Sequence, residues 1–132
     1  MHPAIQIIVK DVLAFHQHLE KNSVILEGVR DYGLLESSIH TPFQSFGGED
    51  LYPTVFDKAA QLCYGIAKNH PFVDGNKRTA LHTMLVYLRL NNINLVASKD
   101  EFKAFIVGVA ASQIDPHQMA IWLEKHAKTI SP

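Results

Sequence analysis

The sequence has one cysteine, no long apolar run and no excess of positive charge. Cys63 alone cannot form an internal disulfide or a cysteine-based zinc cluster, and its apolar neighbours predict a small buried core residue. No stretch approaches the roughly 20 apolar residues that a membrane-spanning helix needs. The formal net charge of -1 gives no sign of the basic stripe typical of nucleic-acid binding. We therefore expect a protein that binds neither a membrane nor a nucleic acid.

The length and the start of the chain favour one cytoplasmic domain. Residues 1–6 have neither the basic flank nor the apolar stretch of a signal peptide. The 132 residues match the length of one domain and are enough to bury a core. With 47% hydrophobic and 19% charged residues, the composition is that of an ordinary globular protein. We expect a single domain over residues 1–132.

Helical periodicity dominates the pattern of apolar residues. The strongest pattern starts at Pro53, in the first turn of a helix, and repeats at spacings of three and four up to Ile66. A second one runs from about Asn76 to Leu90, with Leu81, Met84, Leu85 and Leu88 as its apolar face. Shorter helices are expected at residues 12–19 and 34–39, after the capping box of Ser98, and from Asp115–Pro116. The sequence predicts an all-α bundle whose loop around Gly47 leaves room for a small β-hairpin.

The loop between the two strongest helices has the residue types that phosphate chemistry needs. A helix that begins at Asn76 presents free N–H groups and the positive end of its dipole to an anion. Gly75 removes a side chain where a phosphate would approach the backbone. Lys77 and Arg78 put two cations in the first turn, where the dipole disfavours them unless an anion compensates.

Two more residues of this loop suit catalysis. Asp74 offers a hard oxygen ligand for Mg²⁺, and His70 is of the residue type most often used as a general base. The alternative is that the His-Pro pair only ends a helix and that Asp-Gly-Asn is ordinary turn chemistry. The concentration of a base, an acid, a glycine, an amide and two cations in nine residues favours the phosphate site.

These nine residues also resemble a known family signature. Residues 70–78 read HPFVDGNKR and are similar to the Fic motif, H-P-F-x-[DE]-G-N-[GK]-R. Residues 30–37 and 47–53 resemble the segment before the flap, and the flap itself, in the Doc (death-on-curing) branch. Lys77 replaces the glycine of most adenylylating members, and Leu81 stands where their second arginine falls. The resemblance covers most of the chain and points to the Doc branch.

The resemblance implies a compact Fic-fold helical bundle with a small β-hairpin flap. It implies the toxin of a type II toxin–antitoxin system, a cytoplasmic protein kinase that moves the γ-phosphoryl of ATP to a Thr or Ser hydroxyl. Its expected target is elongation factor Tu, so that translation is inhibited and growth is arrested. Its expected partner is a Phd-like antitoxin, whose C-terminal segment folds onto a groove of the toxin. The flap would pair with an extended piece of the target.

The same resemblance implies a role for each residue of the loop. His70 would be the general base, and Asp74 would be a ligand of Mg²⁺. Gly75 and Asn76 would form the anion nest. Lys77 and Arg78 would bind the ATP phosphates and stabilise the charge on the transferring group. Phe72 is expected to anchor the loop in the core.

Two other functions stay open. The first is AMP transfer to a target hydroxyl, against which Lys77 and Leu81 argue. The second is a catalytically silent module that acts by binding a partner, against which the intact set of loop residues argues.

Two further patterns carry weaker hypotheses. Residues 23–28 match [ST]-x-x-x-E-[GN], the pattern of an autoinhibitory helix in some Fic proteins, in which Glu27 would pair with Arg78. We expect a loop there instead. His16 and His18 lack the acidic or cysteine partners of a metal site, so we expect histidines on a helix face.

Overall fold

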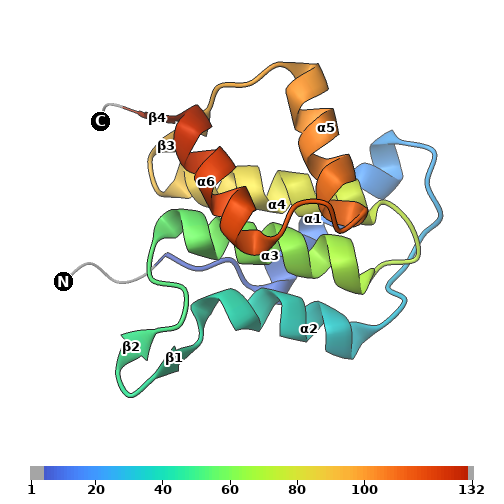
Figure 1. Ribbon diagram of the computed structural model, residues 1–132. Coiled ribbons are helices and arrows are strands. Elements are labelled where there is room, and N and C mark those ends of the chain that lie inside the picture. The colour runs from blue at the N-terminus through green and yellow to red at the C-terminus, as the bar shows by residue number, and fades with distance from the viewer. Residues whose placement is uncertain (1–4, 131–132) are drawn as a thin grey trace.

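The computed structural model describes residues 5–130, which fold into six α-helices and two small antiparallel sheets (Figure 1). The elements are α1 (Val9–Asn22), α2 (Tyr32–His40), the 3-10 helix η1 (Thr41–Phe43), β1 (Ser45–Phe46), β2 (Glu49–Asp50), α3 (Val55–Asn69), α4 (Asn76–Leu90), β3 (Ile93–Leu95), α5 (Lys99–Ala110), α6 (Pro116–His126) and β4 (Ala127–Thr129). The predicted helical bundle with a small hairpin is confirmed. Residues 1–4, part of the segment considered for a signal peptide, lie outside the described range. Within that range, no helix is both long and apolar enough to cross a membrane.

The centre of the bundle is α3, which packs against α2, α4, α5 and α6. Leu62, Cys63 and Ile66 on its apolar face are fully buried, whereas Val55 and Phe56 in its first turn are half-buried. The helix begins at Val55, two residues after Pro53, which was predicted to lie in its first turn. Thr54 is the cap, because its hydroxyl accepts the Asp57 N–H at 3.0 Å and its own N–H donates to the Asp57 carboxylate at 3.3 Å. Pro53 therefore lies before the cap and not in the first turn.

The buried face of α4 differs in part from the predicted one. Met84 and Leu88 are fully buried as predicted, whereas Leu81 and Leu85 are only half-buried. Ala80 and Tyr87 take part in the core in their place. The small Ala80 side chain allows close approach to neighbouring helices, a packing effect that counting apolar residues does not capture.

A second sheet joins the ends of α4 and α6 and was not predicted. Strands β3 and β4 pair in the register Ile93↔Thr129, Asn94↔Lys128 and Leu95↔Ala127. Each strand has three residues, which is too short for an alternating pattern to be recognised in the sequence. The pairing buries Leu95 and fixes the chain on both sides of the α5–α6 hairpin.

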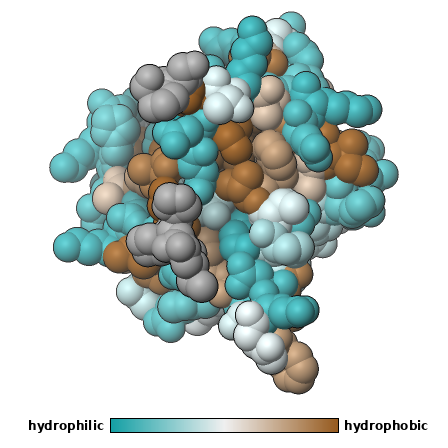
Figure 2. All heavy atoms as spheres, turned by 90° about the vertical axis from the view of Figure 1, so that its left-hand side faces the viewer, coloured by the Kyte–Doolittle hydropathy of each residue, from teal (hydrophilic) through white to brown (hydrophobic). Residues whose placement is uncertain are grey.

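The β1–β2 hairpin, which we call the flap, projects from the body of the molecule (Figure 2). Gly47 and Gly48 form its turn with φ angles of 60° and 81°, the positive values that a tight two-residue hairpin turn requires. The buried Lys58 of α3 anchors it by donating to the Asp50 carboxylate at 3.0 Å and to the Tyr52 carbonyl.

Truncation of the central helix provides a test of this core. We expect Leu62→Ala to lower the free energy of unfolding by about 2–5 kcal/mol, because it removes buried methyl groups and leaves a cavity. Leu90→Ala is the matched control: Leu90 is 48% exposed, so its loss should change stability by no more than about 0.5 kcal/mol. Urea denaturation followed by circular dichroism measures both. Equal effects would contradict a core centred on α3.

The burial of Cys63 makes its thiol unreactive. Burial raises the pKa of Cys63 to about 12, so the thiol stays protonated at pH 8, and the thiolate is the reactive form. We expect a water-soluble disulfide reagent to leave the folded protein unlabelled for hours at pH 8 and to label one thiol per chain at once in denaturant. Rapid labelling of the folded protein would contradict the observed burial.

Candidate functional site

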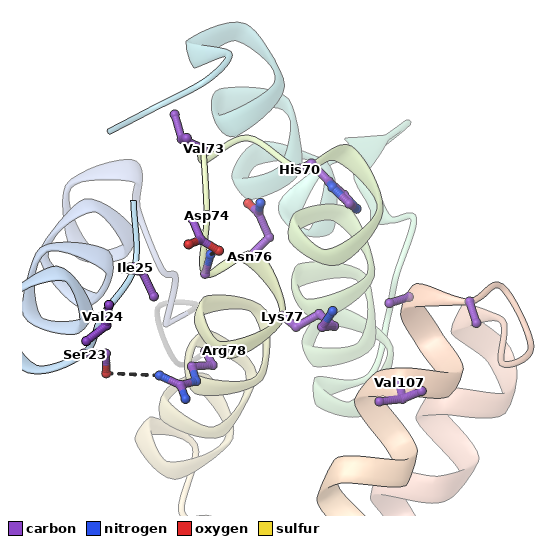
Figure 3. A pocket seen from close by; sticks show the side chains of 13 residues that line it. Ser23, Val24, Ile25, His70, Val73, Asp74, Asn76, Lys77, Arg78 and Val107 are labelled. Carbon is purple, nitrogen blue, oxygen red and sulfur yellow. Dashed lines mark hydrogen bonds between the residues drawn. The ribbon is translucent and has the colours of Figure 1, made fainter. Parts of the chain in front are cut away.

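A cavity of about 1010 Å³ lies between the start of α4, residues 23–25 and the end of α5 (Figure 3). All of the site residues that the sequence predicts line it: His70, Asp74, Gly75, Asn76, Lys77 and Arg78. The flap does not line it. The flap lies before α3 and His70 directly after it, and the 15 residues of α3 extend over about 22 Å (Figure 1). The flap and the loop therefore lie at opposite ends of α3.

The N-terminus of α4 points its free backbone N–H groups at this cavity. Helices α2, α3, α5 and α6 each begin with a side chain that caps them. At α4 the cap position is Gly75, and no side chain within residues 5–130 caps the helix or adds an acid to its first turn. Lys77 and Arg78 occupy that turn instead. An anion bound there would satisfy both the free N–H groups and the two cations.

Gly75 is required for a different reason from the one expected. It has a φ of 76°, which favours glycine, and a Cβ on it would lie 2.9 Å from Leu19 Cδ2 and 3.1 Å from Ile25 Cδ1. The absence of a side chain at Gly75 therefore makes room for the Leu19 and Ile25 side chains, which pack against the loop. The close approach of a phosphate from above remains a prediction.

The loop is anchored to the core by Phe72 and Asn76. Phe72 is 1% exposed, as predicted. Its N–H donates to the Asn76 side-chain oxygen at 2.9 Å, and its carbonyl accepts the Asn76 side-chain N–H at 3.0 Å. Both polar atoms of the Asn76 side chain thus hold the loop, and its backbone N–H is the group left for an anion.

His70 is exposed at the mouth of the cavity and has an unusual backbone conformation. It ends α3 with φ 49° and ψ 57°, a left-handed geometry that costs a residue other than glycine about 1 kcal/mol. Arg30 stabilises this end, because its Nε donates to the His70 carbonyl at 2.6 Å and its Nη2 to the Asn69 carbonyl at 2.7 Å. The sequence placed Arg30 in a segment typical of the Doc branch but did not reveal this contact.

The Asp74 carboxylate is held in its charged form by backbone donors. The Leu26 N–H donates to Oδ2 at 3.0 Å and the Gly75 N–H to Oδ1 at 2.8 Å. These bonds, the one from Leu26 foremost, hold the pKa of Asp74 below its ordinary value, and the nearby His16 and Arg78 add to the effect. An ionised carboxylate at the edge of the cavity suits a hard cation.

The residues around Asp74 indicate which kind of metal could bind. Among residues 5–130, no three His, Cys, Asp or Glu side chains are grouped as metal ligands. Mg²⁺ does not need such a group, because one or two carboxylates together with substrate phosphates and water usually complete its shell. Asp74 therefore fits an ion that arrives with a phosphate ligand.

The two cations of the loop lie on opposite sides of the cavity. Lys77 extends toward α3 and α5, whereas Arg78 extends toward residues 23–25 (Figure 3). Arg78 Nη1 donates to the Ser23 hydroxyl at 3.0 Å. No Arg78–Glu27 ion pair occurs among the described residues, and residues 23–28 form no helix, so the autoinhibitory pairing considered for Glu27 is not observed.

His16 lies on a face of α1, as predicted, and the structure adds that this face is buried beneath the loop. Its side chain is 3% exposed, stacks on Phe72 with ring centroids 3.8 Å apart, and bonds the Asp74 carbonyl through Nε2 at 2.8 Å. The only available signal was its position among the apolar residues of α1, between Val12 and Leu19.

Comparisons with known proteins agree with this geometry. The sequence model described as the Fic/DOC family matches residues 6–88, which include the whole loop. The chain is 38% identical to "Toxin Doc" of Mycolicibacterium smegmatis over 97 residues, which cover 67% of this chain and 75% of that protein. It is 28% identical to "Protein kinase doc" of Escherichia phage P1 over 116 residues, covering 88% and 90%. The chain belongs to the Fic/DOC family.

Proposed function

We propose that this protein is a Doc-type toxin that transfers the γ-phosphoryl group of ATP to a Ser or Thr hydroxyl of a target protein. The observation that carries the proposal is the convergence of His70, Asp74, Lys77 and Arg78 on one cavity, at a helix N-terminus that no side chain within residues 5–130 caps. The similarity to proteins named toxin and protein kinase supports the same function.

The proposed chemistry begins with the target hydroxyl beside His70. His70 takes the hydroxyl proton while the oxygen bonds to the γ-phosphorus, and the bond from that phosphorus to the β,γ-bridging oxygen breaks to release ADP. The exposure of His70 and its fixed position at the end of α3 suit this role. A hydroxyl on a protein surface could reach His70 because the side chain lies at the mouth of the cavity.

The phosphates would bind at the start of α4. The free N–H groups of the first turn, Lys77 on one side and Arg78 on the other provide the positive charge that the transferring group needs. Asp74 would hold Mg²⁺, which, when bound, neutralises charge on the phosphate oxygens. Because Ser23 now accepts from Arg78, a phosphate oxygen would replace a neutral acceptor with a charged one.

Two residues favour phosphoryl transfer over AMP transfer. Lys77 puts a long cationic side chain where adenylylating members have glycine. Leu81 is half-buried and packs on the core, so α4 has no second arginine one turn after Arg78. The proposal extends to a type II system: elongation factor Tu as the target, inhibition of translation, and a Phd-like antitoxin as the partner of this cytoplasmic protein.

Intact mass spectrometry tests the reaction. Purified protein is incubated with ATP, Mg²⁺ and either bacterial lysate or purified elongation factor Tu. We expect a gain of about 80 Da on the target, and His70→Ala should slow this gain by about 100- to 10,000-fold because the base is lost. His117→Ala, which removes an exposed histidine of α6, is the control and should leave the rate unchanged.

Each other outcome would change the assignment. A gain of about 329 Da would establish AMP transfer and contradict the roles given to Lys77 and Leu81. Growth arrest that survives His70→Ala, with no change in the mass of any target, would favour the silent binding module.

The metal role of Asp74 can be tested without turnover. We expect Asp74→Asn to weaken binding of the non-hydrolysable analogue AMP-PNP in the presence of Mg²⁺ by about 10-fold or more, because the charged ligand is lost. The same substitution should change binding in EDTA far less. Asp100→Asn, at an exposed carboxylate of α5, is the control. Isothermal titration calorimetry measures both, and an equal loss with and without Mg²⁺ would contradict a metal role.

A further inference from the structure

The buried His16 lies directly beneath the proposed phosphate site and takes no part in the chemistry above. Its Nε2 is 2.8 Å from the Asp74 carbonyl oxygen. A carbonyl can only accept a hydrogen bond, so Nε2 carries the proton and donates it. The other ring nitrogen, Nδ1, lies 3.5 Å from the Glu20 carboxylate, which also accepts the Gly28 N–H at 2.8 Å. Glu20 thus lies beside the ring, on the side opposite to the loop.

The bond from His16 fixes more than one oxygen atom. The Asp74 carbonyl and the Gly75 N–H belong to the same peptide unit, which is planar and trans, so they point in opposite directions. With the carbonyl held toward His16, the N–H points the other way and donates to Asp74 Oδ1 at 2.8 Å. The orientation of one peptide plane therefore determines where one oxygen of the Asp74 carboxylate is held.

We propose that His16 is a positioning residue for the phosphate and metal site: its Nε2–H holds the peptide plane between Asp74 and Gly75, and so orients the Asp74 carboxylate at the cavity. This inference rests on the proposed function for its consequence, since the carboxylate is oriented for a metal ion and phosphates. The geometry of the loop itself is independent of that function and is measured separately below.

The same fold contains a histidine with similar contacts far from the loop. His126 of α6 bonds the Trp122 carbonyl through Nδ1 at 2.7 Å, lies 3.2 Å from the Glu101 carboxylate through Nε2, and stacks on Trp122. The hydrogen bonds of a packed histidine are therefore not in themselves a sign of function. His16 differs because the carbonyl that it holds belongs to the loop residue proposed to bind the metal.

Two substitutions separate the hydrogen bond of His16 from its stacking. His16→Phe keeps a ring against Phe72 and loses the donor, whereas His16→Gln keeps a donor at the end of the side chain and loses the ring. His126→Phe is the matched control. We expect His16→Phe to weaken Mg²⁺-dependent binding of AMP-PNP by about 10-fold or more, the usual range for a residue that orients a metal ligand. His16→Gln and His126→Phe should stay close to the wild type.

Amide hydrogen exchange of the protein without nucleotide gives a readout that does not depend on the proposed function. In His16→Phe the Gly75 amide, and the Leu26 amide that also donates to Asp74, should exchange faster than in the wild type. His16→Gln should preserve their protection, and exchange in the centre of α3 should be unchanged in both variants.

The outcomes distinguish the inference from the proposed function. If the wild type binds no AMP-PNP with Mg²⁺, the proposed function fails, and the amide exchange alone then decides whether His16 holds the peptide plane and the carboxylate. If the wild type binds and folded His16→Phe binds equally well with equal amide protection, the inference alone is overturned. A folded His16→Gln that loses both properties would also overturn it, because the ring and not the donor would then be what matters. This last comparison remains decisive if His16→Phe does not fold.

Discussion

The loop from His70 to Arg78 depends on backbone pairing with a segment far away in the sequence. Residues 26–31 run beside residues 71–74, where the Val73 N–H donates to the Gly28 carbonyl at 3.0 Å and the Arg30 and Asp31 N–H groups donate to the Pro71 carbonyl at 2.7 and 3.0 Å. The Leu26 N–H completes the contact at the Asp74 side chain. Without this pairing, the loop between α3 and α4 would have few partners for its polar backbone groups, and neither His70 nor Asp74 would have a defined direction.

Several features that cost free energy occur at this loop, although Asn92 and Ser112 elsewhere in the chain also have positive φ angles. His70 has a left-handed backbone, and α4 starts without a side-chain cap and with two cations in its first turn. Four other helices begin with a capping side chain, and the core around α3 is fully buried. This distribution is typical of proteins in which a binding site departs from local rules and the scaffold compensates for the cost.

The features that could be predicted from the sequence are those that depend on residues close together in the chain. Helix periodicity and capping boxes located the helices to within a few residues, and the motif from His70 to Arg78 identified a loop that lines a cavity of about 1010 Å³. The β3–β4 pairing and the contacts of Arg30 and His16 depend on residues distant in the chain. A histidine on an apolar helix face has the same pattern whether it lies under a site or in an ordinary core, so sequence alone could not separate these cases.

The position of the flap has a consequence for how a target could be recognised. The flap and His70 lie at the two ends of α3, about 22 Å apart along a helix of 15 residues. An extended chain advances about 3.3 Å per residue, so roughly seven residues would be needed to span that distance. A ligand that touches both ends must therefore be an extended segment of at least about seven residues or a folded surface of matching width. The rigid helix would then act as a fixed spacer between recognition and reaction, selecting partners by the distance between two of their features.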